Sequence, residues 1–133
     1  MIVVDSSVWI DFLNGNVTPE VGRLSTLLGT EPLLVGDLIL LEVLQGVRSE
    51  TDAQRVEAAL RRFDIVPMLG PELAVSAPAH YRRLRGLGIT VRKTIDLIIG
   101  TFCIARGHAL LTADHDFAPW PGWTCFGKVE SFF

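Results

Sequence analysis

The chain has 133 residues, of which 49% are hydrophobic and 20% charged, and its net charge is −3. This composition excludes an intrinsically disordered chain, and the length predicts one domain over residues 1–133 with a sizeable core. No apolar run approaches the ~18 residues of a membrane span, and the first residues do not resemble a signal peptide. We therefore expect a protein of the cytoplasm without a membrane partner.

Short apolar segments alternate with longer segments that have helical spacing. In chain order we expect a strand at 2–4, a helix at 20–28, a strand at 32–35, helices at 37–47 and 51–63, a strand at 64–67, helices at 71–87 and 95–105, and strands at 109–112 and 124–126. Uninterrupted apolar strands are typical of a parallel sheet that is buried on both faces. The alternation predicts an α/β fold with helices on both sides of the sheet, and the proline-rich stretch 117–123 predicts a loop.

Two kinds of residue add local detail to this outline. Thr18 or Pro19 is placed to begin the first predicted helix, and Asp37 is placed to cap the second. The two cysteines, Cys103 and Cys125, lie in apolar stretches without CxxC spacing. That setting is typical of small buried side chains that stay reduced, and it favours neither a disulfide nor a zinc site.

Carboxylates follow two of the predicted strands. Asp5 follows the strand at 2–4, and Asp114 follows the strand at 109–112, with Asp116 two residues later. Ligands of open parallel sheets bind beyond the carboxyl ends of the strands, so these positions are candidates for a site. Each also has a simpler interpretation, because Asp5 is placed to cap a following helix and Asp114 is typical of a turn.

Two further acids lie within apolar segments. Glu42 shares a helical stripe with Leu38, Leu41 and Gln45, which predicts apolar neighbours for it, not a solvated face. Asp96 is followed by apolar residues near the start of a predicted helix, where it is also placed to interact with the helix dipole. A carboxylate in apolar surroundings is costly unless another group pairs with its charge. A mid-helix Glu caps nothing, so Glu42 is the hardest of the four acids to explain without a partner.

A divalent cation is a more economical partner for several carboxylates than the few basic residues of these segments. Oxygen ligands without a histidine or cysteine cluster favour Mg²⁺, with Mn²⁺ as a substitute, over zinc. Such an ion suits phosphate-ester hydrolysis, because it activates a bound water and neutralises charge on the phosphate. Assigning four carboxylates to the ion leaves a charge of +1 on the rest of the chain, so the net charge does not exclude RNA.

Four segments of the chain resemble those of PIN domains, and specifically the VapC-type toxins of bacterial toxin–antitoxin pairs. Order and spacing agree with the family along nearly the whole chain. The segments are 2–13, which contains Asp5; 41–46, which contains Glu42; 94–100, which contains Asp96; and 111–117, which contains Asp114 and Asp116 in a TxDxDF pattern. Gly100 stands where many relatives have Ala, and because both residues are small the difference puts nothing about the resemblance in doubt.

The resemblance implies a PIN-like three-layer α/β/α sandwich with a mostly parallel central sheet. It also implies the toxin of a type II toxin–antitoxin pair, an Mg²⁺-dependent endoribonuclease that hydrolyses RNA phosphodiester bonds with a metal-activated water. Its implied partners are a second copy of the chain, in a homodimer, and a cognate VapB antitoxin whose C-terminal segment occupies the active-site groove.

The resemblance carries over to individual residues as follows. The catalytic set is Asp5, Glu42, Asp96 and Asp114. Asp5, Asp96 and Asp114 are the implied metal ligands, with Glu42 completing the site directly or through water. Ser6 follows the first acid and is expected to steady the carboxylates, and Asp116 is expected to assist Asp114.

The residues that face RNA are less sharply defined by the sequence. Arg92 and Lys93 are our candidates for phosphate contact, because they precede Asp96. A second basic cluster, Arg82, Arg83 and Arg85, is more typical of a solvated helix face. The aromatic residues of 119–123 are expected to pack their loop against the domain or a partner. A PIN-like domain that binds RNA or a partner without cleaving remains the alternative to an enzyme.

Overall fold

The computed structural model describes residues 1–117, 119–120 and 124–125, and within these residues five strands form one sheet. The strands are β1 (Ile2–Val4), β2 (Leu33–Gly36), β3 (Asp64–Val66), β4 (Ala109–Leu111) and β5 (Thr124–Cys125). Their order across the sheet is β3-β2-β1-β4-β5, and each neighbouring pair is parallel. The predicted parallel sheet is therefore confirmed.

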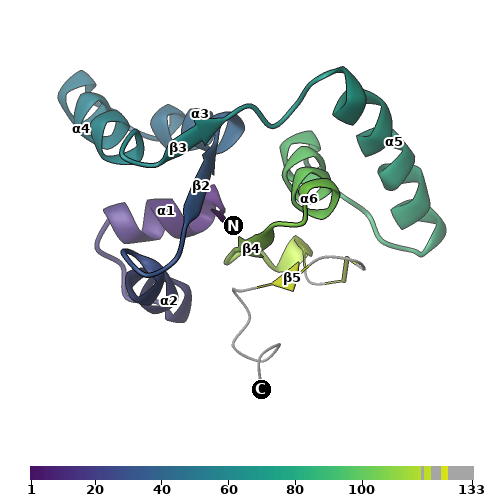
Figure 1. The fold of residues 1–133 in the computed structure, drawn as a ribbon, viewed down its shortest axis with the longest axis horizontal. Helices are drawn as coiled ribbons and strands as arrows, with labels where there is room; N and C mark the ends of the chain where they lie inside the picture. Colours follow the sequence, from purple (N-terminus) through teal and green to yellow (C-terminus); the bar gives the residue numbers. More distant parts are fainter. Residues whose placement is uncertain (118, 121–123, 126–133) are drawn as a thin grey trace.

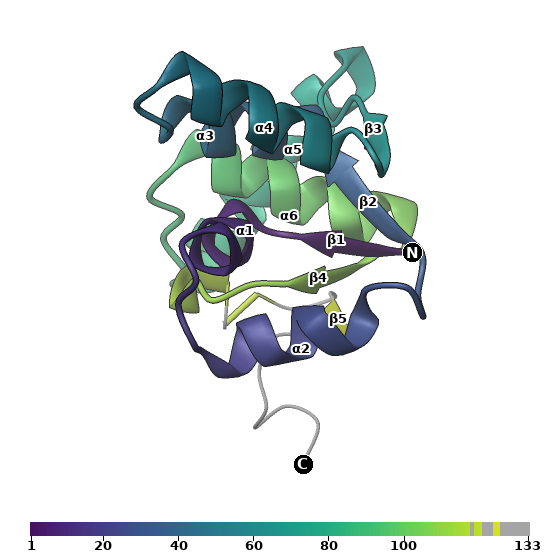
Figure 2. The same ribbon diagram turned by 90° about the vertical axis from the view of Figure 1, so that its left-hand side faces the viewer.

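Helices cover both faces of this sheet (Figures 1 and 2). They are α1 (Ser6–Leu13), α2 (Pro19–Leu27), α3 (Asp37–Gln45), α4 (Glu50–Leu60), α5 (Pro71–Gly86) and α6 (Thr94–Arg106), with a short 3₁₀ helix, η1 (His115–Phe117), after β4. Helix α1 packs against α2 and α3, and α4 packs against α3, on one side of the sheet. Helix α6 lies on the other side, with α5 packed against it. The arrangement is the predicted three-layer α/β/α sandwich.

The beginnings of two helices test the capping predictions. The side chain of Thr18 accepts a hydrogen bond from the backbone N–H of Val21, so α2 begins as predicted. The prediction that Asp37 caps α3 is wrong, because Gly36 holds the cap position and Asp37 is the first helical residue. The Asp37 carboxylate accepts hydrogen bonds from the backbone N–H of Leu38 and of Met68, at 2.8 and 3.0 Å. Asp37 thereby ties the start of α3 to the segment that follows β3.

Three other elements differ from the sequence prediction. Helix α1 was not predicted, and it begins directly after Asp5. Helix α4 begins after Ser49, whose side chain accepts from the backbone N–H of Asp52, and it ends at Leu60, short of Phe63. Strand β3 is an edge strand of the described sheet with no fully buried residue, so burial on both faces is wrong for it.

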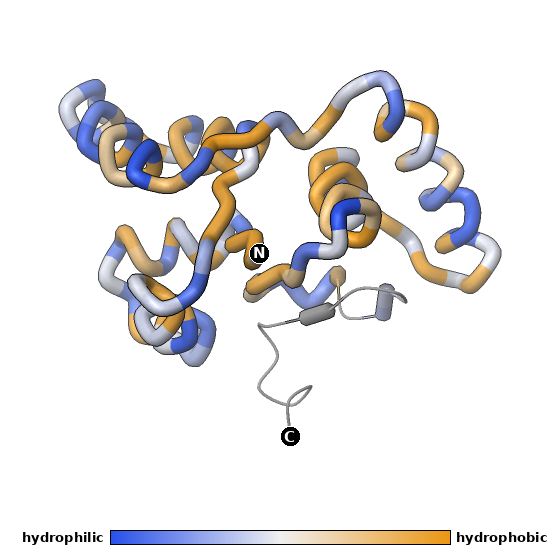
Figure 3. The backbone as a smooth tube through the Cα atoms, in the orientation of Figure 1, coloured by the Kyte–Doolittle hydropathy of each residue, from blue (hydrophilic) through white to orange (hydrophobic). Residues whose placement is uncertain are grey.

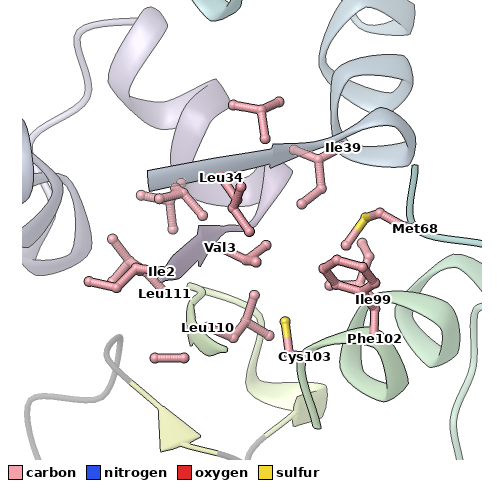
Figure 4. Packing of buried hydrophobic residues seen from close by; sticks show 14 of the residues in the cluster. Ile2, Val3, Leu34, Ile39, Met68, Ile99, Phe102, Cys103, Leu110 and Leu111 are labelled. Carbon is pink, nitrogen blue, oxygen red and sulfur yellow. The ribbon is translucent and has the colours of Figure 1, made fainter. Parts of the chain in front are cut away.

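The core lies on both faces of the three central strands, which are the hydrophobic segments at the centre of Figure 3. Adjacent residues of a strand point to opposite faces. Val3 and Leu110 lie on the face covered by α6, near Cys103, whereas Ile2 and Leu111 lie on the other face (Figure 4).

The Cys103 thiol belongs to this core. It is buried and unbonded, and burial raises its pKa to about 12, so it is an unreactive hydrophobic side chain as predicted. The side chain of Cys125 lies outside the described residues. No described helix combines the length and the hydropathy that a membrane crossing needs.

Candidate active site

The carboxyl ends of β1 and β4 place two predicted site residues at the same edge of the sheet. Val4 is in register with Leu111, and the backbone N–H of Asp5 donates to the Leu111 carbonyl at 2.9 Å. The chain then leaves β4 through Thr112 toward Asp114. Parallel strands therefore bring together two segments that are more than 100 residues apart.

Asp5 is the most enclosed of the acids, with 3% of its surface exposed. One carboxylate oxygen, Oδ2, accepts hydrogen bonds from Ser7 Oγ at 2.8 Å and from Thr112 Oγ1 at 3.0 Å. Burial raises the pKa of Asp5, the two hydroxyl groups lower it, and the charge of Asp114 raises it. Asp5 does precede α1 at the cap position, but its side chain makes no capping hydrogen bond. Its carboxylate is directed to the sheet edge instead.

Asp96 reaches the same edge from the first turn of α6 and is 5% exposed. Its Oδ2 atom is buried and has no hydrogen-bond partner among the described residues. Burial raises the Asp96 pKa to about 7, with further increases from the charges of Asp5 and Asp114 and an opposing effect of Lys93. A buried carboxylate oxygen without a partner is costly. Asp96 is thus the acid with the clearest need for a cation.

Glu42 lies on α3 and is only partly buried, so its surroundings are less apolar than predicted. The buried residues of α3 are Ile39 and Val43, whereas Leu41, which was predicted to share the Glu42 stripe, is 50% exposed. Glu42 Oε1 accepts a hydrogen bond from Ser6 Oγ at 3.0 Å. Burial raises the Glu42 pKa, the Ser6 hydroxyl lowers it, and the nearby Asp5 charge raises it. Ser6 holds a carboxylate of the group, as predicted.

Asp114 and Asp116 are held by a turn at the end of β4. The backbone N–H of Asp114 donates to Thr112 Oγ1 at 2.9 Å, and the backbone N–H of Asp116 donates to Asp114 Oδ1 at 2.9 Å. In the second bond Asp114 acts as a turn residue, which is the simpler interpretation that its sequence position allowed. The other carboxylate, Asp116, lies with Oδ2 3.9 Å from Nε of Arg92.

The structure brings the predicted acids together and adds a member to the tightest group. One carboxylate oxygen each from Asp96, Asp114 and Asp116 lie within 4.8 Å of one another. Asp5 and Glu42 are close enough to act on the Asp96 pKa but are not part of this trio. The trio contains only oxygen donors, and one of its residues, Asp96, has a buried carboxylate oxygen without a partner among the described residues. These residues fit a hard divalent cation such as Mg²⁺.

Two positioning residues, Ser7 and Thr112, were missed by the sequence reasoning. Both donate to Asp5, and each also accepts a backbone N–H from the β4 end, Ser7 from Ala113 at 3.2 Å and Thr112 from Asp114. Each hydroxyl group therefore joins Asp5, at the end of β1, to the segment that follows β4 and carries Asp114. The signal was present in the TxD spacing of 112–114, although it was interpreted for Asp114 alone.

The predicted RNA-facing residues border the acids. Arg92 is 77% exposed and approaches Asp116, and the charge of Lys93 lowers the pKa of both Asp96 and Glu42. These two cations lie beside a group of acids whose charges raise one another's pKa. Cations of this kind are the side chains that contact phosphates in nucleic-acid complexes.

An aromatic anchor follows the acid-bearing turn. Trp120 is 5% exposed, its ring lies 5.2 Å from that of Phe117, and it meets the His80 ring edge-on at 5.3 Å. A Cβ atom on Gly100 would come within 2.2 Å of the Trp120 ring. Replacing Gly100 with Ala would therefore require the Trp120 ring to move. Trp120 packs against the domain as predicted, whereas Trp123 lies outside the described residues.

A parallel α/β sandwich with an acidic, oxygen-only site at the carboxyl ends of its strands is typical of metal-binding α/β domains. Sequence comparison shows to which family of such domains the chain belongs. The family model for the PIN domain matches residues 2–119. The chain belongs to the PIN domain family. It is 26% identical over 122 residues to ribonuclease VapC11 of Mycobacterium tuberculosis, covering 88% of this chain and 89% of the relative.

Solved structures agree on the fold. VapBC2 from Rickettsia felis, bound to a DNA fragment from its promoter, matches with a TM-score of 0.76 and 18% identity over 94% of this chain and 97% of that one. A toxin–antitoxin complex from Klebsiella pneumoniae matches with a TM-score of 0.72 and 22% identity, covering 93% and 96%. At these identities the likeness bears on the fold.

Proposed function

We propose that this protein is an Mg²⁺-dependent endoribonuclease and the toxin of a VapBC-type toxin–antitoxin pair. The observation that carries the proposal is the buried Asp96 oxygen without a partner, next to the carboxylates of Asp114 and Asp116. Holding several mutually repelling acids in one place is costly unless a cation compensates their charge. Membership of the PIN family and the similarity to a protein named as a ribonuclease support RNA as the substrate.

The proposed ligands of the cation are Asp5, Asp96 and Asp114, as the family resemblance implies. The trio geometry adds Asp116, and Glu42 completes the acidic group. When bound, a divalent cation supplies a more acidic water and neutralises charge on the scissile phosphate.

The chain's own residues prepare this site. Ser7 and Thr112 stabilise the charged form of Asp5, because both hydroxyl groups donate to Oδ2. Ser6 fixes Oε1 of Glu42, which leaves Oε2 to accept a hydrogen bond from water. Lys93 is placed to hold a phosphate beside the acids, where its positive charge offsets theirs.

The experiment is RNA cleavage by the purified protein with Mg²⁺, with EDTA, and as Asp5→Ala or Asp96→Ala. We expect cleavage with Mg²⁺ alone and its loss in EDTA and in both variants. Undiminished cleavage by both variants would contradict the mechanism. A folded wild-type protein that binds Mn²⁺ and RNA but cleaves no RNA would favour the alternative, a binding module.

The proposed protein partner is a VapB-type antitoxin. A cavity of about 670 Å³ between α1, α3 and α4 supports this, because its lining joins apolar side chains to charged ones, as a protein partner would need. The apolar part is Ile10, Leu13, Val43, Val47 and Val56, and the charged part is Arg48, Asp52 and Arg55. Ile10 and Leu13 are also 36% and 39% exposed. We propose a homodimer as the toxin form and, given an RNA substrate, the cytoplasm as its location. Co-expression with the product of the adjacent upstream gene, followed by affinity purification of this chain, tests the pairing.

A further inference from the structure

A second cavity, of about 290 Å³, lies between α5 and the segment that leads into α6. Its lining includes Tyr81 of α5, Val91, Arg92 and Lys93 of the preceding segment, and Thr94 and Leu97 of α6. Small-molecule sites in proteins typically measure ~300–1,000 Å³, so this cavity lies just below that range. It has room for one planar ring system and is too small for a helix or a strand of a partner.

This cavity adjoins the acidic site through its basic wall. Arg92 Nε lies 3.9 Å from Asp116 Oδ2, and the Lys93 charge lowers the pKa of Asp96 and Glu42. Thr94 begins α6 two residues before Asp96. A ligand that spans the acids and the cavity would therefore pass directly over the two cations.

The lining combines three properties of a nucleotide-binding site. Arg92 and Lys93 are exposed cations for a phosphate, Val91 and Leu97 supply an apolar wall, and Tyr81 supplies an aromatic ring. Single-stranded RNA is bound in proteins by basic grooves combined with aromatic rings on which unpaired bases stack. The Arg85 guanidinium lies 5.8 Å from the Tyr81 ring centroid, within cation–π distance, and is not part of the cavity lining.

The larger cavity beside α4 lacks this combination. Its two cations, Arg48 and Arg55, share the lining with Asp52, and Arg55 lies 4.0 Å from the Asp52 carboxylate. No aromatic ring lines it among the described residues. The cavity at Tyr81 joins cations and an aromatic ring to the acids.

We propose that the Tyr81 cavity binds one unpaired base of the RNA, next to the phosphate that Arg92 and Lys93 hold beside the acids. The proposal rests on the proposed function only in taking RNA as the substrate. It predicts that the protein prefers single-stranded RNA over a duplex, because a paired base cannot enter the cavity.

The experiment measures RNA binding by fluorescence anisotropy in EDTA, in an Asp96→Asn background that prevents cleavage. The probes are a labelled 12-nucleotide single strand of mixed sequence and the corresponding duplex. In that background Tyr81→Leu, which keeps apolar volume but removes the ring, should weaken single-strand binding by about 5- to 100-fold, the range that one stacked base provides. Tyr81→Phe should bind as the background protein does. Neither change should affect the duplex by more than about twofold.

Arg92→Gln tests the basic wall and Arg83→Gln is its matched control, since Arg83 lies on α5 and lines a different cavity. Only Arg92→Gln should reduce the slope of log affinity against log salt, by about one phosphate contact. Each variant is also tested for an unchanged melting temperature.

The outcomes separate this proposal from the proposed function. Single-strand binding that is the same for Tyr81→Leu, Tyr81→Phe and the background protein would overturn the base site, even if the wild type cleaves RNA. A loss confined to single strands in Tyr81→Leu would support the base site, even if no cleavage is found. Equal losses in Tyr81→Leu and Tyr81→Phe would overturn stacking as the mode of binding.

Discussion

The Thr112 hydroxyl donates a hydrogen bond to the Asp5 carboxylate at 3.0 Å, between residues that are 107 positions apart. The same hydroxyl oxygen accepts the backbone N–H of Asp114 at 2.9 Å. One side chain thus fixes the distance between two acids on neighbouring strand ends. Thr112 is 5% exposed, so water cannot easily reach its partners. Removing the hydroxyl group would therefore leave buried polar groups unpaired, which costs stability.

Thr112→Val keeps the shape of the side chain and removes both hydrogen bonds. We expect the free energy of unfolding to fall by about 1–3 kcal/mol, the cost of leaving buried polar groups unpaired. The pKa of Asp5 should rise further, since a bond that lowers it is lost. Weaker binding of Mn²⁺, measured by calorimetry at neutral pH, should accompany the loss of stability.

Thr101→Val is the matched control for this change. Thr101 is equally buried and hydrogen-bonds to His80 at 3.0 Å, in the interior between α5 and α6. The control should lose stability without losing Mn²⁺ affinity. If both variants bind Mn²⁺ as the wild type does, Thr112 has no special role at the acids.

Gly100→Ala introduces a methyl group where the Trp120 ring lies. A Cβ atom 2.2 Å from that ring forces the indole to move, so we expect a destabilisation of about 1–3 kcal/mol in chemical unfolding. Trp120→Phe in the same chain makes room, and the double variant should be more stable than additive single effects predict. Gly22→Ala, on α2 with open space around it, should be neutral or stabilising. Additive effects at Gly100 and Trp120 would show that the contact is not formed.

The pH dependence of stability follows from the raised pKa of Asp96. In the cation-free folded protein this pKa is about 7, compared with an ordinary value of 3.8. Between these two values the folded protein holds a proton that the unfolded chain has released, so raising the pH favours unfolding. The contribution of Asp96 to stability should therefore decline from about pH 4 to pH 7 and then level off.

This decline is measured as a difference from Asp96→Asn, whose amide does not titrate. The histidines are common to both proteins, so their titration cancels in the difference. Asp96→Asn should match the wild type near pH 4 and exceed its free energy of unfolding near pH 8 in EDTA. A difference that does not vary with pH would mean that the Asp96 carboxyl titrates as an ordinary exposed acid.

The sequence predicted the sheet and the positions of the acids, because both follow from local patterns. Short apolar strands that end in Asp5 and Asp114 are visible in the chain, and parallel pairing alone brings them together. Helix α1 was not among the expected elements because its eight residues follow a strand directly, although the capping interpretation of Asp5 assumed a helix at that point. The hydrogen bonds that join Thr112 to Asp5 and Ser7 to Ala113 were not predictable, since a hydroxyl side chain does not reveal its distant partner.

Residues whose role depends on a contact across the fold show the same limit. Gly100 and Trp120 are 20 positions apart, and only the packing of the acid-bearing turn on α6 shows that one requires the other. The partly buried setting of Glu42 was also misjudged, because a helical stripe predicts a shared direction but not which side of α3 faces the core. Local patterns located the site, and the contacts that hold it required the structure.

The central claim is that these carboxylates form a site for a divalent cation. Mn²⁺ titration followed by electron paramagnetic resonance at pH 8 tests it most directly, with wild type, Asp96→Asn and the control Asp52→Asn on the exposed face of α4. We expect saturable Mn²⁺ binding by the wild type and by Asp52→Asn, and binding weaker by more than about tenfold in Asp96→Asn. Equal binding by all three proteins, or no binding by a folded wild type, would contradict the claim.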